Sequence, residues 1–246
     1  MLDTKRLWRL PRLALVFASL AVSPAFAETC DRTISVFCSG DPGVAVVTGP
    51  AGVTDGETIR VGPIVVRLWG IDAPEAGQTC GTLSGGSWPC GERATERLAH
   101  LSRGETVRCL GRQRDPYGRL LAVCIANGEQ LNARIVRDGL AWAFVRYSRD
   151  YVDLEAEARA RQVGVWQAPS EAPWDYREKR WQRASAESPR PGCPIKGNIN
   201  NNGEKIYHTP WSPAYDRTRI DESAGERWFC DEGDALAAGW RPAKWR

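Results

Sequence analysis

The chain has 246 residues, of which 33 are Lys or Arg and 30 are Asp or Glu. This length accommodates one domain of about 100 to 150 residues and a smaller second unit. No apolar run approaches the ~20 residues that a membrane-spanning helix needs, so a stable membrane span is not expected.

Residues 1–27 are predicted to be a secretory signal peptide. Four basic residues precede the apolar run 13–22, and Ala25 and Ala27 offer the small side chains that a signal peptidase selects. We expect a secreted or periplasmic protein that begins at Glu28. Because the segment holds four basic residues and one acidic residue, the mature chain carries no formal net charge, and phosphate binding must depend on where charges are placed.

All eight cysteines follow residue 28, as is typical of proteins from oxidising compartments. The connectivity does not follow from the sequence, and four local disulfides are the preferred interpretation. A zinc cluster is the alternative, but the absence of any Cys-x-x-Cys spacing disfavours it. The neighbouring couples are Cys30 with Cys38, Cys80 with Cys90, Cys109 with Cys124, and Cys193 with Cys230.

The first elements indicate a curled antiparallel sheet that follows a short Cys-bracketed extension, residues 28–43. The first strand is mostly β-branched and is expected to end at Gly49-Pro50, and Asp55-Gly56 marks the turn before the next strand. Short strands joined by tight turns favour a barrel or a curled sheet over a parallel fold. The expected strands are residues 44–48, 57–61 and 65–68.

A Gly- and Ser-rich loop at residues 76–91 precedes the remaining elements of this domain. Helical spacing of apolar residues predicts helices, and β-rich runs on either side of a proline-containing turn predict two more strands. The order of elements is that of a five-stranded Greek-key OB barrel with about three packed helices, an α+β fold that is mainly β and spans residues 44–168. The expected helices are 92–102, 131–138 and 151–162, and the expected strands are 106–110 and 120–125.

The rest of the chain is predicted to form a Pro-rich charged linker, residues 169–192, and a small C-terminal module, residues 193–246. The linker is expected to hold a short helix with a solvated charged face; contact of its basic residues with a nucleic-acid backbone is the alternative. The module is too small to bury much core, so a staple between Cys193 and Cys230 makes physical sense. The basic residues of the linker patch include Arg177, Lys179, Arg180 and Arg183.

The stretch VVRLWGIDAPE, residues 65–75, combines a permanent cation with two carboxylates. Arg67 offers a planar fork of donors to phosphate oxygens. Asp72 is a hard oxygen ligand for Ca²⁺ or Mg²⁺, and Glu75 is a candidate general base. The plainer alternative is a barrel strand that ends in an acidic turn, with Arg67 and Asp72 in a structural salt bridge.

Two more charged groups follow predicted turns: Glu57 comes after Asp55-Gly56, and Arg119 comes after a Pro-Tyr-Gly turn. Arginines and carboxylates that converge at a barrel mouth suit phosphodiester hydrolysis. A metal would hold a phosphate oxygen and the attacking water, a carboxylate would take the proton, and the arginines would stabilise charge on the phosphoryl oxygens. Arg119 has the alternative role of capping a hairpin, and Asp55 and Asp115 are interpreted as turn-formers.

With these motifs the sequence resembles the thermonuclease (staphylococcal nuclease-like) family. Each piece is weak alone, but the ordered set covers about residues 44–167. The C-terminal module is similar to a small domain called sunset, whose role does not follow from its residues. The matching pieces are the DGxT turn (55–58), RLxGIDxPE (67–75), the DxYGR turn (115–119), the helix start at Leu131-Asn132 followed by Leu140-Ala141, and Gly164-Val165-Trp166.

The resemblance implies a Ca²⁺-dependent endo- or exonuclease that cleaves DNA and RNA by base-assisted attack of water and leaves 3'-phosphates. It assigns Arg67 and Arg119 to the scissile phosphate and Glu75 to the general base. The implied metal ligands are the Asp72 carboxylate, the Ala73 carbonyl oxygen, and the carboxylate of the residue that stands at position 57. A monomer is expected.

Position 57 departs from the family, which has aspartate there. Glu57 is one methylene longer, so its carboxylate reaches roughly 1.5 Å further. Ca²⁺ tolerates variable oxygen geometry, and therefore metal binding is expected to survive with a misplaced attacking water and a slower reaction.

Two other functions remain open on the sequence. A secreted ribonuclease with two catalytic histidines is disfavoured, because His100 lies on a predicted helix and His208 lies in the other module. A catalytically impaired OB-fold module that only binds nucleic acid is the stronger alternative, and Glu57 is the residue that favours it.

Overall fold

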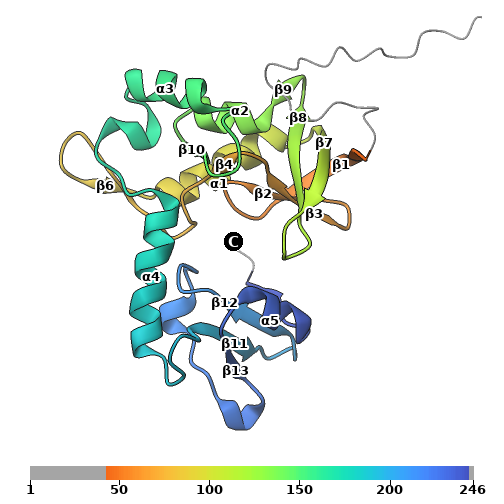
Figure 1. Cartoon of the computed structure of the whole chain (residues 1–246), viewed down its shortest axis with the longest axis vertical. Helices are drawn as coiled ribbons and strands as arrows, with labels where there is room; N and C mark the ends of the chain where they lie inside the picture. Colours follow the sequence, from red (N-terminus) through yellow and green to blue (C-terminus); the bar gives the residue numbers. More distant parts are fainter. Residues whose placement is uncertain (1–42, 244–246) are drawn as a thin grey trace, which may run out of the picture.

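The computed structural model describes residues 43–243 of the chain (Figure 1). The predicted signal peptide and the couple Cys30 with Cys38 lie outside the described residues. Within residues 43–243, no helix is long and apolar enough to cross a membrane.

Five strands close into a barrel. Neighbours follow the order β3-β2-β1-β7-β8, and a parallel pairing of β3 with β8 completes the circle. This Greek-key order confirms the OB barrel predicted from the sequence. The five strands are β1 (Ala45–Val53), β2 (Thr58–Val61), β3 (Ile64–Leu68), β7 (Thr106–Arg114) and β8 (Leu120–Ala126).

Strand β1 does not end at Gly49-Pro50, so that prediction is wrong. The strand changes partner there: Pro50 pairs with Thr106 of β7, and Ala51 pairs with Val61 of β2. Proline lacks the N–H that a continuous ladder needs, and a change of partner is a place where it is tolerated. The second partner, β2, depends on the closed barrel and cannot be predicted from the sequence around Pro50.

Short strands and helices surround the barrel. The buried faces of α1 and α2 carry apolar residues such as Leu98 and Ile135, which belong to the same core as the barrel residues Ile59, Val66 and Leu68. The helices are α1 (Cys90–Ser102), α2 (Leu131–Arg137) and α3 (Val152–Ala160), with the 3₁₀ helix η1 (Gly164–Gln167). The short strands are β4 (Ile71–Asp72), β5 (Cys80–Gly81), β6 (Ser87–Trp88), β9 (Glu129–Gln130) and β10 (Trp142–Ala143).

Three of the four expected disulfides are present among the described residues, and each joins the couple named from the sequence. Cys80 bonds to Cys90, Cys109 to Cys124, and Cys193 to Cys230. Cys109 and Cys124 are register partners on β7 and β8, as expected of a cross-strand bridge. No described cysteine is free.

The segment after the barrel is dominated by one helix rather than by irregular linker. Helix α4 (Pro173–Glu187) has 15 residues and runs from the barrel domain to the C-terminal module (Figure 1). The module has its own small core, which includes Ile195, Tyr207, Phe229 and Trp240. Its elements are β11 (Ile195–Ile199), β12 (Lys205–His208), η2 (Tyr215–Arg217), η3 (Glu222–Ala224), β13 (Arg227–Phe229), α5 (Glu232–Ala237) and β14 (Arg241–Pro242).

Candidate active site

Strands β3 and β4 carry two of the sequence-predicted residues, Arg67, which lines a cleft, and Asp72, which contacts Arg67. Arg67 lies on β3, the chain turns at Gly70, and Asp72 pairs with Trp142 from β4 to β10. Gly70 has a φ of 75°, which side-chain-bearing residues rarely adopt, and a Cβ there would lie 2.9 Å from the Tyr151 ring. Asp72 is fully buried. A buried carboxylate requires partners, and they come from other elements.

Glu57 reaches the site because the turn before it packs closely. A Cβ on Gly56 would lie 2.8 Å from the Cβ atoms of both Ala73 and Ala94, so only glycine fits. Asp55 Oδ1 accepts the Glu57 N–H at 3.0 Å, as expected of a turn-former. Glu57 Oε2 accepts the Ala73 N–H at 2.9 Å. The longer side chain at position 57 therefore braces the backbone of another predicted metal-binding residue.

Arg67 joins the two carboxylates predicted to bind metal. It forms ion pairs with Glu57 and, at 3.3 Å, with Asp72 Oδ1. Burial raises the pKa of the Glu57 carboxyl to about 8, against the opposing influence of Arg67. The salt bridge between Arg67 and Asp72, which is the structural alternative to a role in catalysis, is thus present.

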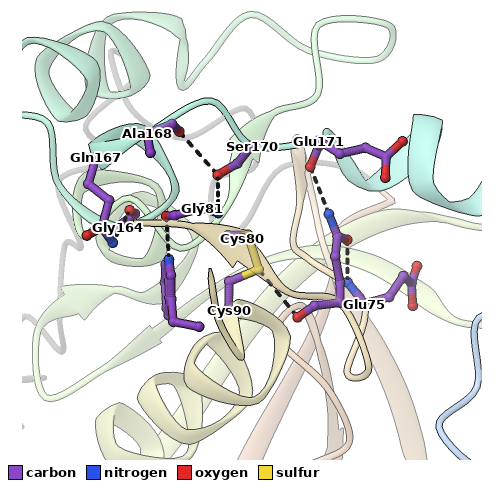
Figure 2. Close-up of a disulfide and its surroundings, with 11 residues drawn as sticks. Glu75, Cys80, Gly81, Cys90, Gly164, Gln167, Ala168, Ser170 and Glu171 are labelled. Atoms are coloured by element: carbon purple, nitrogen blue, oxygen red, sulfur yellow. Dashed lines mark hydrogen bonds between the residues drawn. A yellow bond between two sulfur atoms is a disulfide. The ribbon is translucent and has the colours of Figure 1, made fainter. Parts of the chain in front are cut away.

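The backbone of Glu75 is held on both sides. Its N–H donates to Gln78 Oε1 at 3.1 Å, and its carbonyl oxygen accepts the Gln78 N–H at 2.7 Å. Gln78 Nε2 donates to the Glu171 carbonyl oxygen, so Glu75 and Glu171 lie close together beside the Cys80–Cys90 disulfide (Figure 2). Burial raises the pKa of Glu75 to about 7 despite a nearby arginine.

Arg119 lies at the turn between β7 and β8 and lines the same cleft. Its Nε is 2.5 Å from Asp115 Oδ2, and its guanidinium lies over the Tyr117 ring at 5.2 Å from the centroid. Asp115 Oδ1 also accepts the N–H groups of Tyr117 and Arg119, as predicted for a turn-former. The pair orients a guanidinium at the cleft wall and shapes the hairpin as well.

Sequence reasoning missed one member of the cluster, Arg177 on α4. Its Nη1 and Nη2 lie 3.0 and 2.7 Å from the two Asp72 oxygens, and Nη1 lies 2.8 Å from Glu75 Oε1. The prediction of a solvated charged face is therefore wrong for this residue, whose side chain is 22% exposed. The only feature of the sequence that pointed to Arg177 was its place in a basic patch. Its contacts could not be predicted, because Asp72 and Glu75 are more than 100 residues away in the sequence.

The cleft lies between the barrel domain and the C-terminal module and has a volume of about 1210 Å³. The barrel side contributes the residues described above. Helix α4 contributes Trp174, Arg177 and Trp181, and the module contributes Trp211 and Glu232. The site is thus built from all three parts of the described chain.

The donor set suits a hard divalent cation. Carboxylate and carbonyl oxygens are the ligands that Ca²⁺ takes, and Arg67 brings the carboxylates of Glu57 and Asp72 together next to the backbone of Ala73. Between residues 43 and 243, no three His, Cys, Asp or Glu side chains are arranged to hold an ion. The carboxylates are instead held by Arg67 and Arg177.

The two described histidines do not share a site. His100 borders a separate, smaller pocket with Arg97 and Glu105. His208 lies in the C-terminal module, where Nε2 is 2.9 Å from Asn198 Oδ1 and Nδ1 is 3.3 Å from Ser212 Oγ. Neither lines the large cleft, so the arrangement does not favour a two-histidine ribonuclease.

Two family models match this chain, one in the barrel domain and one in the C-terminal part. Residues 65–168 match the family model described as Staphylococcal nuclease homologue. Residues 179–242 match the ArfC model, and the sunset-like identity expected for this module stays a prediction.

Several relatives align with half of the chain or more. A micrococcal nuclease of Shigella flexneri is 35% identical over 151 residues, and the alignment covers 54% of this chain and 78% of that protein. An uncharacterized endonuclease of Escherichia coli is 36% identical over 136 residues, with 52% and 82% covered. Protein ParB of Escherichia coli is 31% identical over 194 residues, with 71% and 94% covered. The barrel, the ordered motifs and these relatives together show that the chain belongs to the staphylococcal nuclease homologue family.

Proposed function

We propose that the protein is a metal-dependent nuclease that hydrolyses phosphodiester bonds of DNA and RNA. The main observation behind the proposal is that Glu57, Asp72 and Glu75 are joined by Arg67 and Arg177 into one cluster, most of which lines a large cleft. The names of the relatives, micrococcal nuclease and endonuclease, support the same function. Ca²⁺ is the proposed metal because its flexible coordination suits the longer carboxylate at position 57.

In the proposed mechanism, Arg67 and Arg119 bind the non-bridging oxygens of the scissile phosphate and stabilise the charge that develops on them. Glu75 takes a proton from the attacking water. Asp72, Glu57 and the Ala73 carbonyl oxygen would hold the cation, which would supply Lewis-acid polarisation of the phosphate and the water when bound. Water forms the new P–O bond and the bond to the 5' oxygen breaks. The leaving 5' oxygen takes up a proton from solvent, so the products are a 3'-phosphate and a 5'-hydroxyl.

We propose that the protein acts outside the cytoplasm, in the periplasm or after secretion. The three disulfides support this location, because such bonds persist in oxidising compartments. The predicted signal peptide would deliver the protein there.

A second function, nucleic-acid binding without turnover, rests on the contacts of Glu57. Both of its oxygens have protein partners, Ala73 N–H and Arg67. If they stay there, the cation lacks one carboxylate ligand. The same cleft then binds a nucleic acid and does not cut it.

The test uses purified chain 28–246 with linear DNA and with RNA, in Ca²⁺, in Mg²⁺ and in EDTA. We expect cleavage in Ca²⁺, none in EDTA, and a loss of at least ~100-fold in Glu75→Gln, the order of magnitude that general-base catalysis contributes. Glu178→Gln is the matched control, because Glu178 is an exposed carboxylate on α4 that lines the same cleft. Binding without cutting supports the second function, and cutting in EDTA refutes metal dependence.

A further inference from the structure

Helix α4 carries Arg177, whose guanidinium contacts Asp72, a proposed metal ligand, and Glu75, the proposed general base. Arg177 lies outside residues 65–168, the segment that matches the nuclease family model. Its guanidinium meets Asp72 through two nitrogens, at 3.0 and 2.7 Å, and Glu75 through one, at 2.8 Å. Bidentate pairs of this kind are among the stronger charged interactions in proteins.

Arg177 engages both oxygens of Asp72. Asp72 Oδ1 accepts from Arg177 Nη1 and also from Arg67 Nη2 at 3.3 Å, and Oδ2 accepts from Arg177 Nη2. Asp72 is fully buried, so guanidinium groups rather than solvent face its oxygens. A cation that binds Asp72 therefore competes with Arg177 for the same carboxylate.

The same contact occupies the candidate general base. Glu75 Oε1 accepts from Arg177 Nη1 at 2.8 Å. A water molecule that needs this oxygen for its proton competes with the guanidinium. Release of Arg177 thus frees the metal ligand Asp72 and the general base Glu75 at the same time.

Carboxyl groups outnumber guanidinium groups in this cluster. Glu57, Asp72 and Glu75 contact Arg67 or Arg177, and Asp55 accepts the Glu57 N–H beside them. The cluster therefore holds more carboxyl oxygens than its two arginines need, and such oxygens are the ligands that Ca²⁺ takes.

Helix α4 is anchored on both sides of Arg177, at Trp174 and at Arg180, so the backbone of Arg177 is held in place. Trp174 stacks on Phe144 of the barrel domain with ring centroids 5.7 Å apart. Arg180 Nε donates to the Pro210 carbonyl oxygen of the C-terminal module at 2.8 Å. Because Arg177 lines the open cleft and is 22% exposed, its side chain has space to swing away while the helix stays docked.

We propose that Arg177 is an internal competitor of the divalent cation, which holds Asp72 and Glu75 until the ion displaces it. The inference rests on the proposed metal-dependent function. It assigns to the segment after the nuclease domain a regulatory contact that sets the cation concentration at which the site becomes competent.

The other role open to Arg177 is that of a third phosphate-binding arginine. The geometry favours competition, because both terminal nitrogens are engaged by carboxylates. A phosphate-binding arginine is expected to leave donors directed at the space that the phosphate occupies.

The test is calorimetric titration of the whole mature chain, residues 28–246, with Ca²⁺ and without nucleic acid. If Arg177 keeps the Asp72 site closed for 90 to 99% of the time, its removal tightens binding by about 10- to 100-fold. We therefore expect Arg177→Gln to bind Ca²⁺ about 10- to 100-fold more tightly than the wild type. Arg183→Gln is the matched control, because it removes an exposed arginine from the same helix and should leave the Ca²⁺ affinity unchanged.

Arg177→Lys separates release of the contact from loss of charge. Lysine keeps the positive charge but lacks the planar fork, so its Ca²⁺ affinity should lie between those of the wild type and Arg177→Gln. This variant also decides the question if Arg177→Gln does not fold, as checked by circular dichroism. An affinity of Arg177→Lys at or below that of the wild type overturns the proposal.

The nuclease assay distinguishes this proposal from the proposed function. The Ca²⁺ concentration for half-maximal cleavage should fall in Arg177→Gln by the same factor as the dissociation constant. Unchanged or weaker Ca²⁺ binding with slower cleavage overturns the competitor role and assigns Arg177 to the phosphate. Absence of Ca²⁺ binding in the variant overturns it too, whether or not nucleic acid is cut.

Discussion

Glu57 contacts two other parts of the candidate site. The residue braces the Ala73 backbone and pairs with Arg67, and the proposed mechanism also requires it as a metal ligand. An aspartate is too short to span all of these partners. The extra methylene therefore lets the Glu57 carboxylate reach both the Ala73 N–H and Arg67. These contacts compete with binding of the metal by the same carboxylate.

Glu57→Asp should raise the turnover number in saturating Ca²⁺, because the shorter carboxylate leaves Arg67 and returns an oxygen to the cation. We expect a stability loss of about 1 kcal/mol as the hydrogen bond from the Ala73 N–H weakens. Turnover and urea unfolding measured on the same preparation check both effects. Turnover no higher than that of the wild type would refute this account of position 57.

His208 makes the C-terminal module sensitive to acid. Burial, together with the positive charges of Lys196 on β11 and Arg217 on η2, lowers the pKa of His208 to about 4. The unfolded histidine binds its proton near pH 6.5, so the unfolded state takes up more protons between these values. The stability contribution is complete above pH 6.5 and is lost as the pH falls toward 4.

We expect the module to lose on the order of 2 kcal/mol of its free energy of unfolding between pH 7 and pH 4.5. His208→Gln should flatten this dependence, because glutamine keeps polar contacts with Asn198 and Ser212 but does not titrate. Urea unfolding at the two pH values measures it. His100→Gln is the control, and equal slopes in His208→Gln and wild type would contradict the assignment.

The elements of the barrel fix the site through close backbone contacts. The turn before β2 touches the chain after β4 and also α1. Gly91, near the start of α1, lies against the Glu75 carbonyl oxygen, and an added Cβ there would be 1.7 Å from that oxygen. The Cys80–Cys90 disulfide fastens the intervening loop. Three elements thus converge on the backbone that carries Asp72, Ala73 and Glu75.

Gly56→Ala tests this convergence. A Cβ at this position would overlap the Cβ atoms of Ala73 and Ala94 at 2.8 Å, so the turn must move away and carry Glu57 with it. We expect a stability loss of about 2 kcal/mol by overpacking and a marked loss of Ca²⁺ affinity. Gly52→Ala is the control, because nothing lies within 4 Å of its added Cβ. Similar losses in both variants would show that packing at the turn does not position the site.

At the level of the whole molecule, α4 joins two cores and reaches into the cleft between them. Its N-terminal part packs on an aromatic cluster of the barrel domain through Trp174, and Trp181 packs on the core of the C-terminal module. Arg177 lies between these two anchors. The helix therefore couples the position of the module to the charge of the site.

Trp174→Ala should loosen this coupling. Loss of the ring removes contacts to Phe144 and Trp142, at centroid distances of 5.7 and 6.5 Å, and a cost of about 3 kcal/mol is expected. Hydrogen exchange should accelerate in residues 173–187 but not in residues 195–242. Trp166→Ala, which removes a Trp142 contact without touching α4, is the control. Unchanged exchange across α4 would show that Trp174 does not anchor the helix.

Local sequence was enough for much of the barrel and for the disulfide couples. Alternating apolar residues and turn dipeptides specify short strands, and cysteines close in sequence had few better partners than each other. The exception, β1, shows the limit: its continuation past Pro50 depends on a change of partner from β7 to β2. A local sequence pattern predicts that a strand forms, but it does not predict which other strand will pair with it.

The sequence by itself determined the family, the barrel and the residues of the RLxGIDxPE motif, because these depend on residue types at short, fixed spacings. Only the tertiary structure showed that Glu57 braces Ala73 and that Arg177 lies on Asp72 and Glu75. From sequence alone, a charged residue on a helix is predicted to face solvent unless a partner of opposite charge lies nearby in the sequence. The partners of Arg177, Asp72 and Glu75, are more than 100 residues away. The contact exists because folding places α4 across the cleft, where burial makes an unpaired carboxylate costly and a guanidinium stabilising.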